Sequence, residues 1–276
     1  VSMKAGIIGG TGKMGQLFVP VFERAGYDVI VSGRSTAVTN EKIAETCDLV
    51  IVSVPIRDTA RVIGGIAPLM QKEQVLCDFT SLKTGPVAAM LQSKASVIGL
   101  HPMFGPTVSS IRGQTIVVCP ARTTDAALND LTAIFTREGA ICTITTPEEH
   151  DRMMAVVQGL THFVTICMAD SIRRLDIDIQ KTGKFMSPVY QIELGLVGRL
   201  LSQDPALYAD ILQENPYVPE VIDACRSAAG DLTNIVKSGD KGAFAEFFSR
   251  DSRHLGAYCE RGQELTDTLI ECMVKK

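Results

Sequence analysis

The chain has few of the features that mark metal-binding, membrane or nucleic-acid-binding proteins. None of its eight cysteines forms a C-x-x-C pair, so we expect reduced core thiols rather than disulfides or a zinc site, and no bound metal ion. No uninterrupted apolar run approaches the roughly 18 residues of a membrane span, and no signal peptide is evident. The net charge of −4 gives no support for nucleic-acid binding. We therefore expect a cytoplasmic globular protein that acts on a small molecule.

A glycine-rich loop follows the first predicted strand. The apolar residues 5–8 lead into Gly10-Thr11-Gly12-Lys13-Met14-Gly15, which has G-x-G-x-x-G spacing. Such glycines permit a tight turn, close approach of the backbone to a pyrophosphate and packing of the next helix. A helix predicted over residues 14–25 directs its N-terminal amides at the phosphates. Because a second predicted strand follows at residues 27–32, we interpret the loop as a dinucleotide-binding site rather than a plain turn.

An acidic residue is missing where the second strand ends. In chains that bind NAD, a carboxylate at that point holds the ribose hydroxyls. Here the sequence reads Ser32-Gly33-Arg34-Ser35-Thr36, and Asp28 lies too early, at the start of the strand. Arg34 could stack on the adenine and pair with a 2′-phosphate, with Ser35 and Thr36 donating hydrogen bonds. We predict NADP as the cofactor and NAD as the second choice; the alternative role for Arg34 is a solvated turn residue.

The two halves of the chain differ in their apolar pattern. In the first half, β-branched runs alternate with helical spacing, at residues 48–55, 74–78, 97–100, 115–119 and 140–144. This is typical of a mostly parallel sheet covered on both faces. The second half lacks such runs and has helical periodicity, at residues 153–175, 188–201 and 219–237. The sequence predicts an α/β fold, with a Rossmann-type dinucleotide-binding domain at residues 1–146 and an all-helical domain at residues 147–276.

A histidine at the tip of an apolar run is the candidate catalytic residue. His101 lies in Leu100-His101-Pro102-Met103-Phe104-Gly105-Pro106, at the carboxyl end of a predicted strand, where open α/β sheets bind their ligands. A neutral imidazole can take a proton from a substrate hydroxyl while a nicotinamide takes a hydride from the same carbon. The combination predicts a dehydrogenase; the alternative is a histidine that only caps a loop.

Further motifs run in order through nearly the whole chain. They are Val52-Ser53-Val54-Pro55-Ile56, Ser81-Leu82-Lys83-Thr84-Gly85-Pro86, Glu149-His150-Asp151, His162-Phe163, Ser187-Pro188-Val189-Tyr190, Val197-Gly198-Arg199-Leu200, the residues 203–211, and the residues from Gly239 to His254. With the His101 segment they resemble the prephenate dehydrogenase family, and most closely the dehydrogenase portion of bifunctional chorismate mutase/prephenate dehydrogenases. The helical mutase portion has no room ahead of a first strand that starts at about Met3. The resemblance implies oxidative decarboxylation of prephenate to 4-hydroxyphenylpyruvate in tyrosine biosynthesis.

The resemblance also implies roles for residues at the predicted crevice. His101 matches the catalytic histidine, which accepts the proton of the substrate hydroxyl. Ser81 matches a serine that orients the histidine and contacts the nicotinamide; its alternative role is a helix N-cap. Val54 and Pro55 are expected to join the glycine loop in binding the cofactor.

Prephenate carries two carboxylates, so its site needs cationic or strongly donating groups. Arg199 matches the substrate arginine of the family, with an ion pair to Glu193 as the alternative. His162 matches a histidine at the side-chain end of the substrate. Lys83 is a weaker candidate for substrate contact and could equally be a solvated loop lysine. For His150, a helix cap or a hinge hydrogen bond is the better interpretation.

Other functions stay open at this stage. Gln191 stands where enteric members of the family carry a second arginine, which keeps arogenate dehydrogenase as an alternative. A different NADP-dependent small-acid reductase would share the glycine loop and a helical domain but would not predict the His101 segment. A non-catalytic NADP sensor could dispense with His101, Ser81 and Arg199. Apolar stretches in the second half, such as residues 194–197, predict a homodimer formed through the helical domain.

Overall fold

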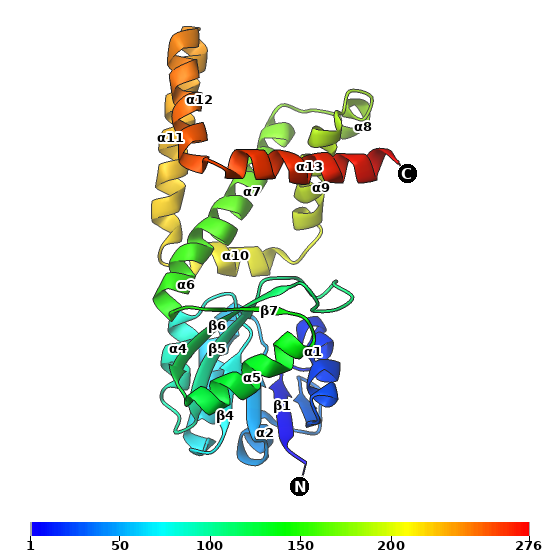
Figure 1. The fold of residues 1–276 in the computed structure, drawn as a ribbon, viewed down its shortest axis with the longest axis vertical. Helices are drawn as coiled ribbons and strands as arrows, with labels where there is room; N and C mark the ends of the chain where they lie inside the picture. The colour runs from blue at the N-terminus through cyan, green and yellow to red at the C-terminus, as the bar shows by residue number, and fades with distance from the viewer. Residues whose placement is uncertain (1, 276) are drawn as a thin grey trace. The chain divides into compact units, whose positions relative to one another are not determined.

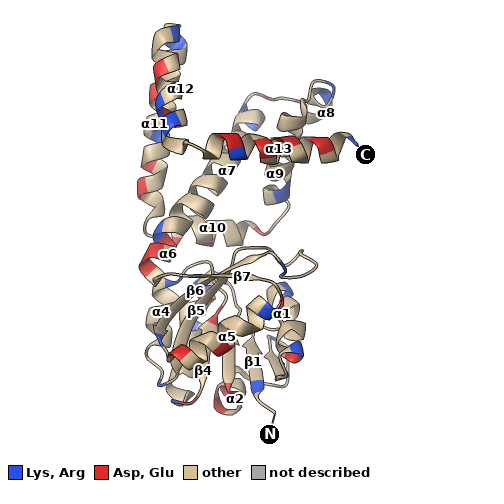
Figure 2. Ribbon diagram, in the orientation of Figure 1, with Lys and Arg blue, Asp and Glu red and all other residues tan. Residues whose placement is uncertain are grey.

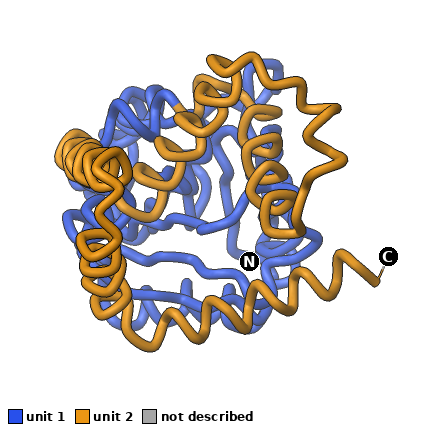
Figure 3. The backbone as a smooth tube through the Cα atoms, turned by 90° about the horizontal axis from the view of Figure 1, so that it is seen from above, with its two compact units in different colours: residues 1–155, 209–216 blue, residues 156–208, 217–276 orange. Residues whose placement is uncertain are grey.

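The computed structural model describes residues 2–275, which form two compact units. Unit 1 comprises residues 1–155 and 209–216, and unit 2 comprises residues 156–208 and 217–276 (Figure 3). The segment 209–216 thus belongs with the N-terminal part of the chain, although it is distant from it in sequence.

Unit 1 is built on a seven-stranded sheet with the order β2-β1-β3-β4-β5-β6-β7 (Figure 1). Its strands are β1 (Lys4–Ile8), β2 (Asp28–Ser32), β3 (Leu49–Val52), β4 (Val75–Asp78), β5 (Ser96–Pro102), β6 (Thr115–Arg122) and β7 (Ile141–Ile144). The first five strands are parallel, β6 pairs antiparallel with β5, and β7 is parallel to β6. The predicted mostly parallel sheet is confirmed.

Helices cover both faces of this sheet. They are α1 (Lys13–Arg24), α2 (Asn40–Thr46), α3 (Ile56–Ile66) with the 3₁₀ turn η1 (Ala67–Leu69), α4 (Thr84–Met90), α5 (Asp125–Arg137) and α6 (Pro147–Met154). Alternate residues of β3 enter different cores: Ile51 packs in the cluster of Phe18 and Phe135, whereas Val52 packs in that of Ile63. Burial of both faces explains why the strands are apolar at every position. Each such side chain contributes about 1.5–3 kcal/mol.

The helices that follow are η2 (Ala155–Leu160), a π-helical turn, then α7 (Thr161–Arg174), α8 (Ile179–Thr182), α9 (Pro188–Leu201), α10 (Pro205–Gln213), α11 (Val218–Ser238), α12 (Lys241–Leu255) and α13 (Tyr258–Val274). Local capping sets several boundaries. Ser187 accepts a hydrogen bond from the amide of Tyr190 at the start of α9, and Asp240 does the same for Ala243 in α12. Gly239 ends α11 with a φ of 67°, in the left-handed region that favours glycine. The predicted helical second half is confirmed.

One helical stretch, Pro147–Arg174, is long and apolar enough to cross a membrane by length and composition alone. Only 17% of its most apolar window is buried in this chain. Core helices of soluble proteins pass the same test, so this is weak support for a membrane segment. The exposed apolar residues include Val156, Val157 and Val164, which need a covering surface of some kind.

Candidate active site

The glycine loop between β1 and α1 has a backbone that only glycine can follow. Gly9 has a φ of 80°, and a Cβ on it would lie 2.2 Å from the carbonyl oxygen of Ser53. A Cβ on Gly15 would lie 2.5 Å from the Cα of Gly10. Helix α1 begins with Gly12 as its N-cap, without a side-chain cap and without an acidic residue in the first turn. This loop therefore fits a pyrophosphate group, for which backbone amides and the helix dipole supply the partners.

The turn after β2 lies directly against this loop. The amides of Gly9 and Gly10 both donate to the carbonyl of Ser32, at 3.0 Å. A Cβ on Gly33 would lie 2.2 Å from Oγ1 of Thr11. A residue with a side chain at position 33 would therefore require Thr11 to move, which gives a physical reason for glycine at this position.

The predicted cofactor residues of this turn differ in environment. Arg34 and Ser35 are exposed. The hydroxyl of Thr36 is used within the turn, since it accepts from the amide of Gly33 and donates to the carbonyl of Val38, each at 2.9 Å. The predicted donation by Thr36 to a phosphate does not fit this geometry. Arg34 and Ser35 remain the candidates for contact with the ribose or its phosphate.

Arg34 lies near a small group of charges at the start of α3. A hydrogen bond from Arg61 lowers the pKa of Asp58, and the charges of Arg57 and Arg34 lower it further. Arg34 therefore lies close enough to Asp58 to sense its charge. Arg57 also pairs with Asp210 at 3.3 Å, so the three arginines exceed the two aspartates of this group by one positive charge, that of Arg34.

The carboxyl edge of the parallel strands collects the other predicted residues of unit 1. Pro55 is the N-cap of α3, which follows β3. Cγ1 of Val54 would lie 3.0 Å from a Cβ on Gly9, so Val54 lies against the glycine loop. Ser81 is half-buried and follows β4. Asp78 and Gly99 are the last paired residues of β4 and β5. Ser81 follows Asp78 by three residues, and His101 follows Gly99 by two, where β5 still pairs with β6. The predicted crevice residues thus share one edge of the sheet.

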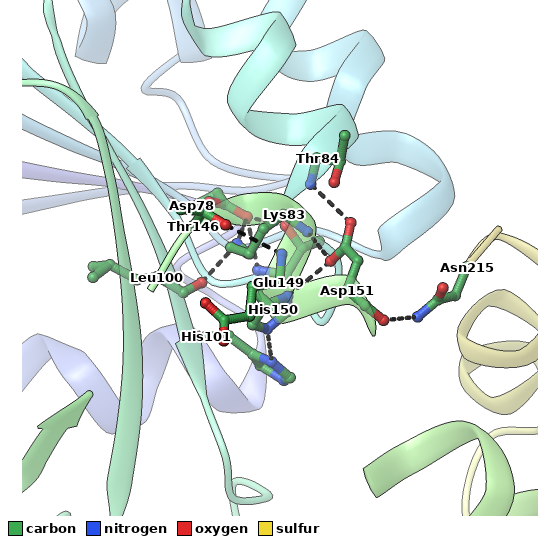
Figure 4. A network of polar contacts seen from close by, with 11 residues as sticks. Asp78, Lys83, Thr84, Leu100, His101, Thr146, Glu149, His150, Asp151 and Asn215 are labelled. Carbon is green, nitrogen blue, oxygen red and sulfur yellow. Dashed lines mark hydrogen bonds and ion pairs between the residues drawn. The ribbon is translucent and has the colours of Figure 1, made fainter. Parts of the chain in front are cut away.

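His101 is 2% exposed and contacts a second buried histidine. Its Nδ1 lies 2.8 Å from Nε2 of His150, and the two rings meet edge to face with centroids 5.1 Å apart (Figure 4). On the other side of the His150 ring, Nδ1 lies 2.8 Å from Oδ1 of Asp151. His150 and Asp151 are 1% and 2% exposed. The three side chains therefore form a buried series that ends at the candidate base.

Asp151 is fixed by the start of α4 and by the segment 209–216. Its carboxylate accepts hydrogen bonds from the amides of Lys83 and Thr84, at 2.8 and 2.9 Å, in addition to the contact with His150. Its backbone carbonyl accepts from Nδ2 of Asn215 at 2.8 Å (Figure 4). Burial acts to raise the pKa of Asp151, but the hydrogen bonds from His150, Thr84 and Lys83 outweigh it and lower the pKa. Asp151 is therefore an anion at neutral pH.

Both histidines of this series are neutral near pH 7. Burial lowers the pKa of His101 well below its ordinary value, and the neighbouring His150 and Lys83 act in the same direction. Burial also lowers the pKa of His150, although its hydrogen bond to Asp151 opposes this. A neutral imidazole can accept a proton, so His101 has the protonation state that a general base requires.

Lys83 is fully buried, and its ammonium group is already bound. It forms an ion pair with Asp78, and it donates to the carbonyl of Leu100 at 2.7 Å (Figure 4). Thr80 donates to the same Asp78 oxygen through its hydroxyl. The predicted substrate contact of Lys83 does not fit this environment, because the ammonium could reach a substrate only by leaving a buried carboxylate unpaired. The geometry favours a role in holding β4, β5 and the start of α4 together.

In unit 2, the two predicted substrate residues, His162 and Arg199, both lie near Tyr208. The ring of His162, on α7, meets that of Tyr208 edge to face at 4.9 Å. Burial raises the pKa of Tyr208, while the charge of Arg199, on α9, acts to lower it. Arg199 is exposed, and no ion pair joins it to Glu193 in the part of the chain that the structure covers. The guanidinium is therefore available to an anion.

No group of three or more His, Cys, Asp and Glu side chains that could hold a metal ion occurs among residues 2–275. The chemistry that the described residues support is proton transfer at His101, at the same sheet edge as the glycine loop.

Comparison with known proteins identifies the family. The model of the prephenate dehydrogenase nucleotide-binding domain matches residues 30–144, and that of the prephenate dehydrogenase dimerization domain matches residues 146–250. This chain belongs to the prephenate dehydrogenase family. The resemblance read from the sequence motifs is confirmed.

Individual relatives cover nearly the whole chain. The probable arogenate/prephenate dehydrogenase of Methanocaldococcus jannaschii is 34% identical in an alignment of 283 positions, which covers 96% of this chain and 64% of the relative. The T-protein of Enterobacter agglomerans is 34% identical over 92% of this chain and 68% of its own length. This chain therefore spans about two thirds of these relatives. The crystal structure of prephenate dehydrogenase from Aquifex aeolicus with hydroxyphenyl propionate and NAD+ matches with a TM-score of 0.74 at 19% identity, over 92% of this chain and 98% of that one.

The structure adds residues to the site that the sequence did not single out. Asp78 and Asp151 were not candidate site residues, and His150 was expected to cap a helix or to form a hydrogen bond at a hinge. The one signal in the sequence was the adjacent pair His150-Asp151 inside a motif shared with the family. Their partners are 49 and 68 residues away along the chain, so only the fold brings them together.

Proposed function

We propose that this chain is a prephenate dehydrogenase that oxidises and decarboxylates prephenate to 4-hydroxyphenylpyruvate. The observation that carries the proposal is His101, a buried and neutral imidazole at the same sheet edge as the glycine loop and Ser81. A nicotinamide nucleotide supplies the hydride acceptor when it is bound at that loop. This family's dehydrogenases, including the structurally similar Aquifex protein in complex with NAD+, support the reaction type.

His101 removes the proton that the oxidation releases. As hydride leaves the ring carbon that bears the hydroxyl, the hydroxyl proton passes to an imidazole nitrogen and the carbon–oxygen bond gains double-bond character. The ring carboxylate then leaves as carbon dioxide, and its bonding electrons complete the aromatic ring. The proton held on His101 returns to the phenolic oxygen. Burial of the imidazole supports this sequence because it keeps His101 unprotonated until the substrate delivers the proton.

Arg199 and His162 are proposed to bind the substrate. The exposed guanidinium of Arg199 offers a bidentate partner to a carboxylate. His162 is half-buried, and burial lowers its pKa, so it offers a neutral hydrogen-bonding group. Arogenate is the second candidate substrate, since the name of the Methanocaldococcus relative includes it and Gln191 removes one possible cation.

NADP is the proposed cofactor. Gly33 leaves no carboxylate to repel a 2′-phosphate, and Arg34 adds an exposed cation beside it, while Arg57 and Arg61 are paired with Asp210 and Asp58. NAD is the alternative, because the Aquifex protein was crystallised with NAD+.

We further propose a cytoplasmic homodimer formed through the helical half. The N-terminal half of α7 carries no charged residue, as Figure 2 shows. Large apolar side chains are exposed on several helices, among them Val164 on α7, Leu196 on α9 and Leu265 on α13. A surface of this kind is typical of an interface, and the matched family model is described as a dimerization domain.

The test is a set of four steady-state assays, with prephenate or arogenate as substrate and NADP or NAD as cofactor, followed by the absorbance of the reduced nicotinamide. We expect the highest kcat/KM with prephenate and NADP. Higher efficiency with arogenate would reverse the substrate proposal, and higher efficiency with NAD would reverse the cofactor proposal. Lack of turnover in all four assays would overturn the function. Sedimentation at a series of concentrations tests the dimer.

A further inference from the structure

His150 and Asp151, the two buried residues behind His101, have no role in the function proposed so far. Two contacts of 2.8 Å connect an anionic carboxylate to Nδ1 of the candidate base. The two nitrogens between that carboxylate and His101 are Nδ1 and Nε2 of His150, whose ring is 1% exposed. Buried polar groups of this kind are costly unless each donor meets an acceptor. The arrangement of protons along the series is therefore restricted.

The carboxylate decides which nitrogen of His150 carries the proton. Asp151 is an anion that already accepts from two backbone amides, so it has no hydrogen to donate to His150. The proton at this contact must lie on Nδ1 of His150. Since His150 is neutral, its Nε2 then carries a lone pair and accepts.

The same reasoning extends to His101. Its Nδ1 faces the lone pair of His150 Nε2 at 2.8 Å, and two lone pairs at that distance would repel. Nδ1 of His101 must therefore carry the hydrogen. In a neutral imidazole the lone pair is then on Nε2. Each nitrogen in the series is thus assigned by its neighbour, and the assignment begins at Asp151.

We propose that His150 and Asp151 are positioning residues, which hold His101 in the tautomer with hydrogen on Nδ1 and thereby make Nε2 the atom that accepts the substrate proton. When Nε2 takes that proton, His101 becomes an imidazolium, and its Nδ1–H remains bonded to His150. The added positive charge is stabilised by this acceptor and by the carboxylate behind it. The catalytic part of the inference rests on the function proposed above. The tautomer itself does not.

Two substitutions of His150 separate this role from simple support of the fold. In His150→Gln, the side-chain amide oxygen can replace Nε2 and accept from His101. In His150→Asn, the shorter amide can reach Asp151 but leaves Nδ1 of His101 without its acceptor. We expect kcat to fall about 10- to 100-fold in the Asn variant, part of the contribution of a positioned base, with KM values within about threefold of the parent. The Gln variant should keep kcat within about tenfold of the parent.

His254→Asn is the matched control, because His254 is exposed on α12; it should retain the parent kcat. A kcat of His150→Asn within twofold of the parent would overturn the proposal. Equal losses in the Asn and Gln variants would also overturn it, because a purely structural histidine has no preference between them.

Nuclear magnetic resonance of the ring nitrogens tests the tautomer without any substrate. The chain has only four histidines, so with ¹⁵N-labelled histidine the His101 and His150 signals can be assigned by comparison of the variants. At pH 7.5 we expect both rings to carry hydrogen on Nδ1, and we expect His101 to shift towards the Nε2–H form in Asp151→Asn. Hydrogen on Nε2 of His101 in the parent protein would refute the inference, whatever the kcat values of the variants. If the parent had the expected tautomer but no activity, the proposed function would fail and the tautomer assignment would stand.

Discussion

Replacement of Lys83 by methionine distinguishes a lysine that supports the fold from one that binds substrate. Methionine matches the lysine side chain as far as Cε but lacks the ammonium, so Asp78 is left as a buried charge without its partner. The other oxygen of Asp78, Oδ1, already has no hydrogen-bond partner among residues 2–275. Breaking a buried pair from one side costs about 3–5 kcal/mol. For a unit of this size, about 2–4 °C of Tm correspond to each kcal/mol, so we expect Tm to fall by about 6–20 °C.

Urea unfolding followed by circular dichroism measures this loss in Lys83→Met, in Asp78→Asn and in the double variant. The double variant should be less destabilised than the sum of the two single variants, because neither charge remains buried and unpaired. Lys42→Met is the control, since Lys42 is exposed; its unfolding free energy should change by less than about 0.5 kcal/mol. The reasoning would be refuted by a Lys83→Met variant whose unfolding free energy lies within about 1 kcal/mol of the parent and whose KM for prephenate is raised.

Four further predictions concern catalysis, cofactor choice, substrate binding and acid stability. His101→Asn should lower kcat by about two to four orders of magnitude while the Kd of the cofactor, measured by fluorescence, stays near that of the parent; turnover within a few-fold would remove His101 from the mechanism. Arg34→Ala should lower kcat/KM with NADP about tenfold, because it removes a phosphate contact of about 1.5 kcal/mol, and should leave kcat/KM with NAD unchanged. Equal losses of kcat/KM with both cofactors would contradict a contact between Arg34 and the 2′-phosphate. Arg199→Ala should raise KM for prephenate about 10- to 150-fold, for a charged hydrogen bond of about 1.5–3 kcal/mol, and an unchanged KM would exclude substrate contact. Burial lowers the pKa of both His101 and His150, so below about pH 6.5 the unfolded chain binds protons that the native chain does not. The free energy of unfolding should therefore be highest above that pH and fall below it, with a slope approaching about 1.4 kcal/mol per pH unit for each histidine. Unfolding curves that do not change between pH 7 and 5 would be inconsistent with the lowered pKa values.

The sheet could be predicted from the sequence because burial of both faces makes its strands continuously apolar. The antiparallel pairing of β5 with β6 was not predicted, although the sequence has a signal for it. A parallel connection needs a crossover, usually a helix, and residues 103–114 contain none. The chain between the two strands therefore reverses direction, and β6 pairs antiparallel with β5.

The start of the long helix was placed too late for a different reason. The predicted helix begins at residue 153, where apolar periodicity begins, whereas α6 starts at Pro147. Its first turns are polar, and they are stabilised by the Thr146 cap and by acidic residues near the helix N-terminus rather than by an apolar stripe. Periodicity does not detect such a turn. The sequence did locate His101, Ser81 and the glycine loop correctly at the strand ends, because strand ends are a property of local pattern.

The late start of the predicted helix and the unexpected role of His150 have a common origin. The polar turns that periodicity misses contain His150 and Asp151, and α6 belongs to unit 1, whereas the residues that follow, 156–208, belong to unit 2. The change of unit falls at the π-helical turn η2, a feature that is frequent at functional sites. A division of the chain after residue 146 would therefore separate His101 from the residues that assign its proton. The sheet supplies the base, but the first turns of the helical segment determine which nitrogen acts.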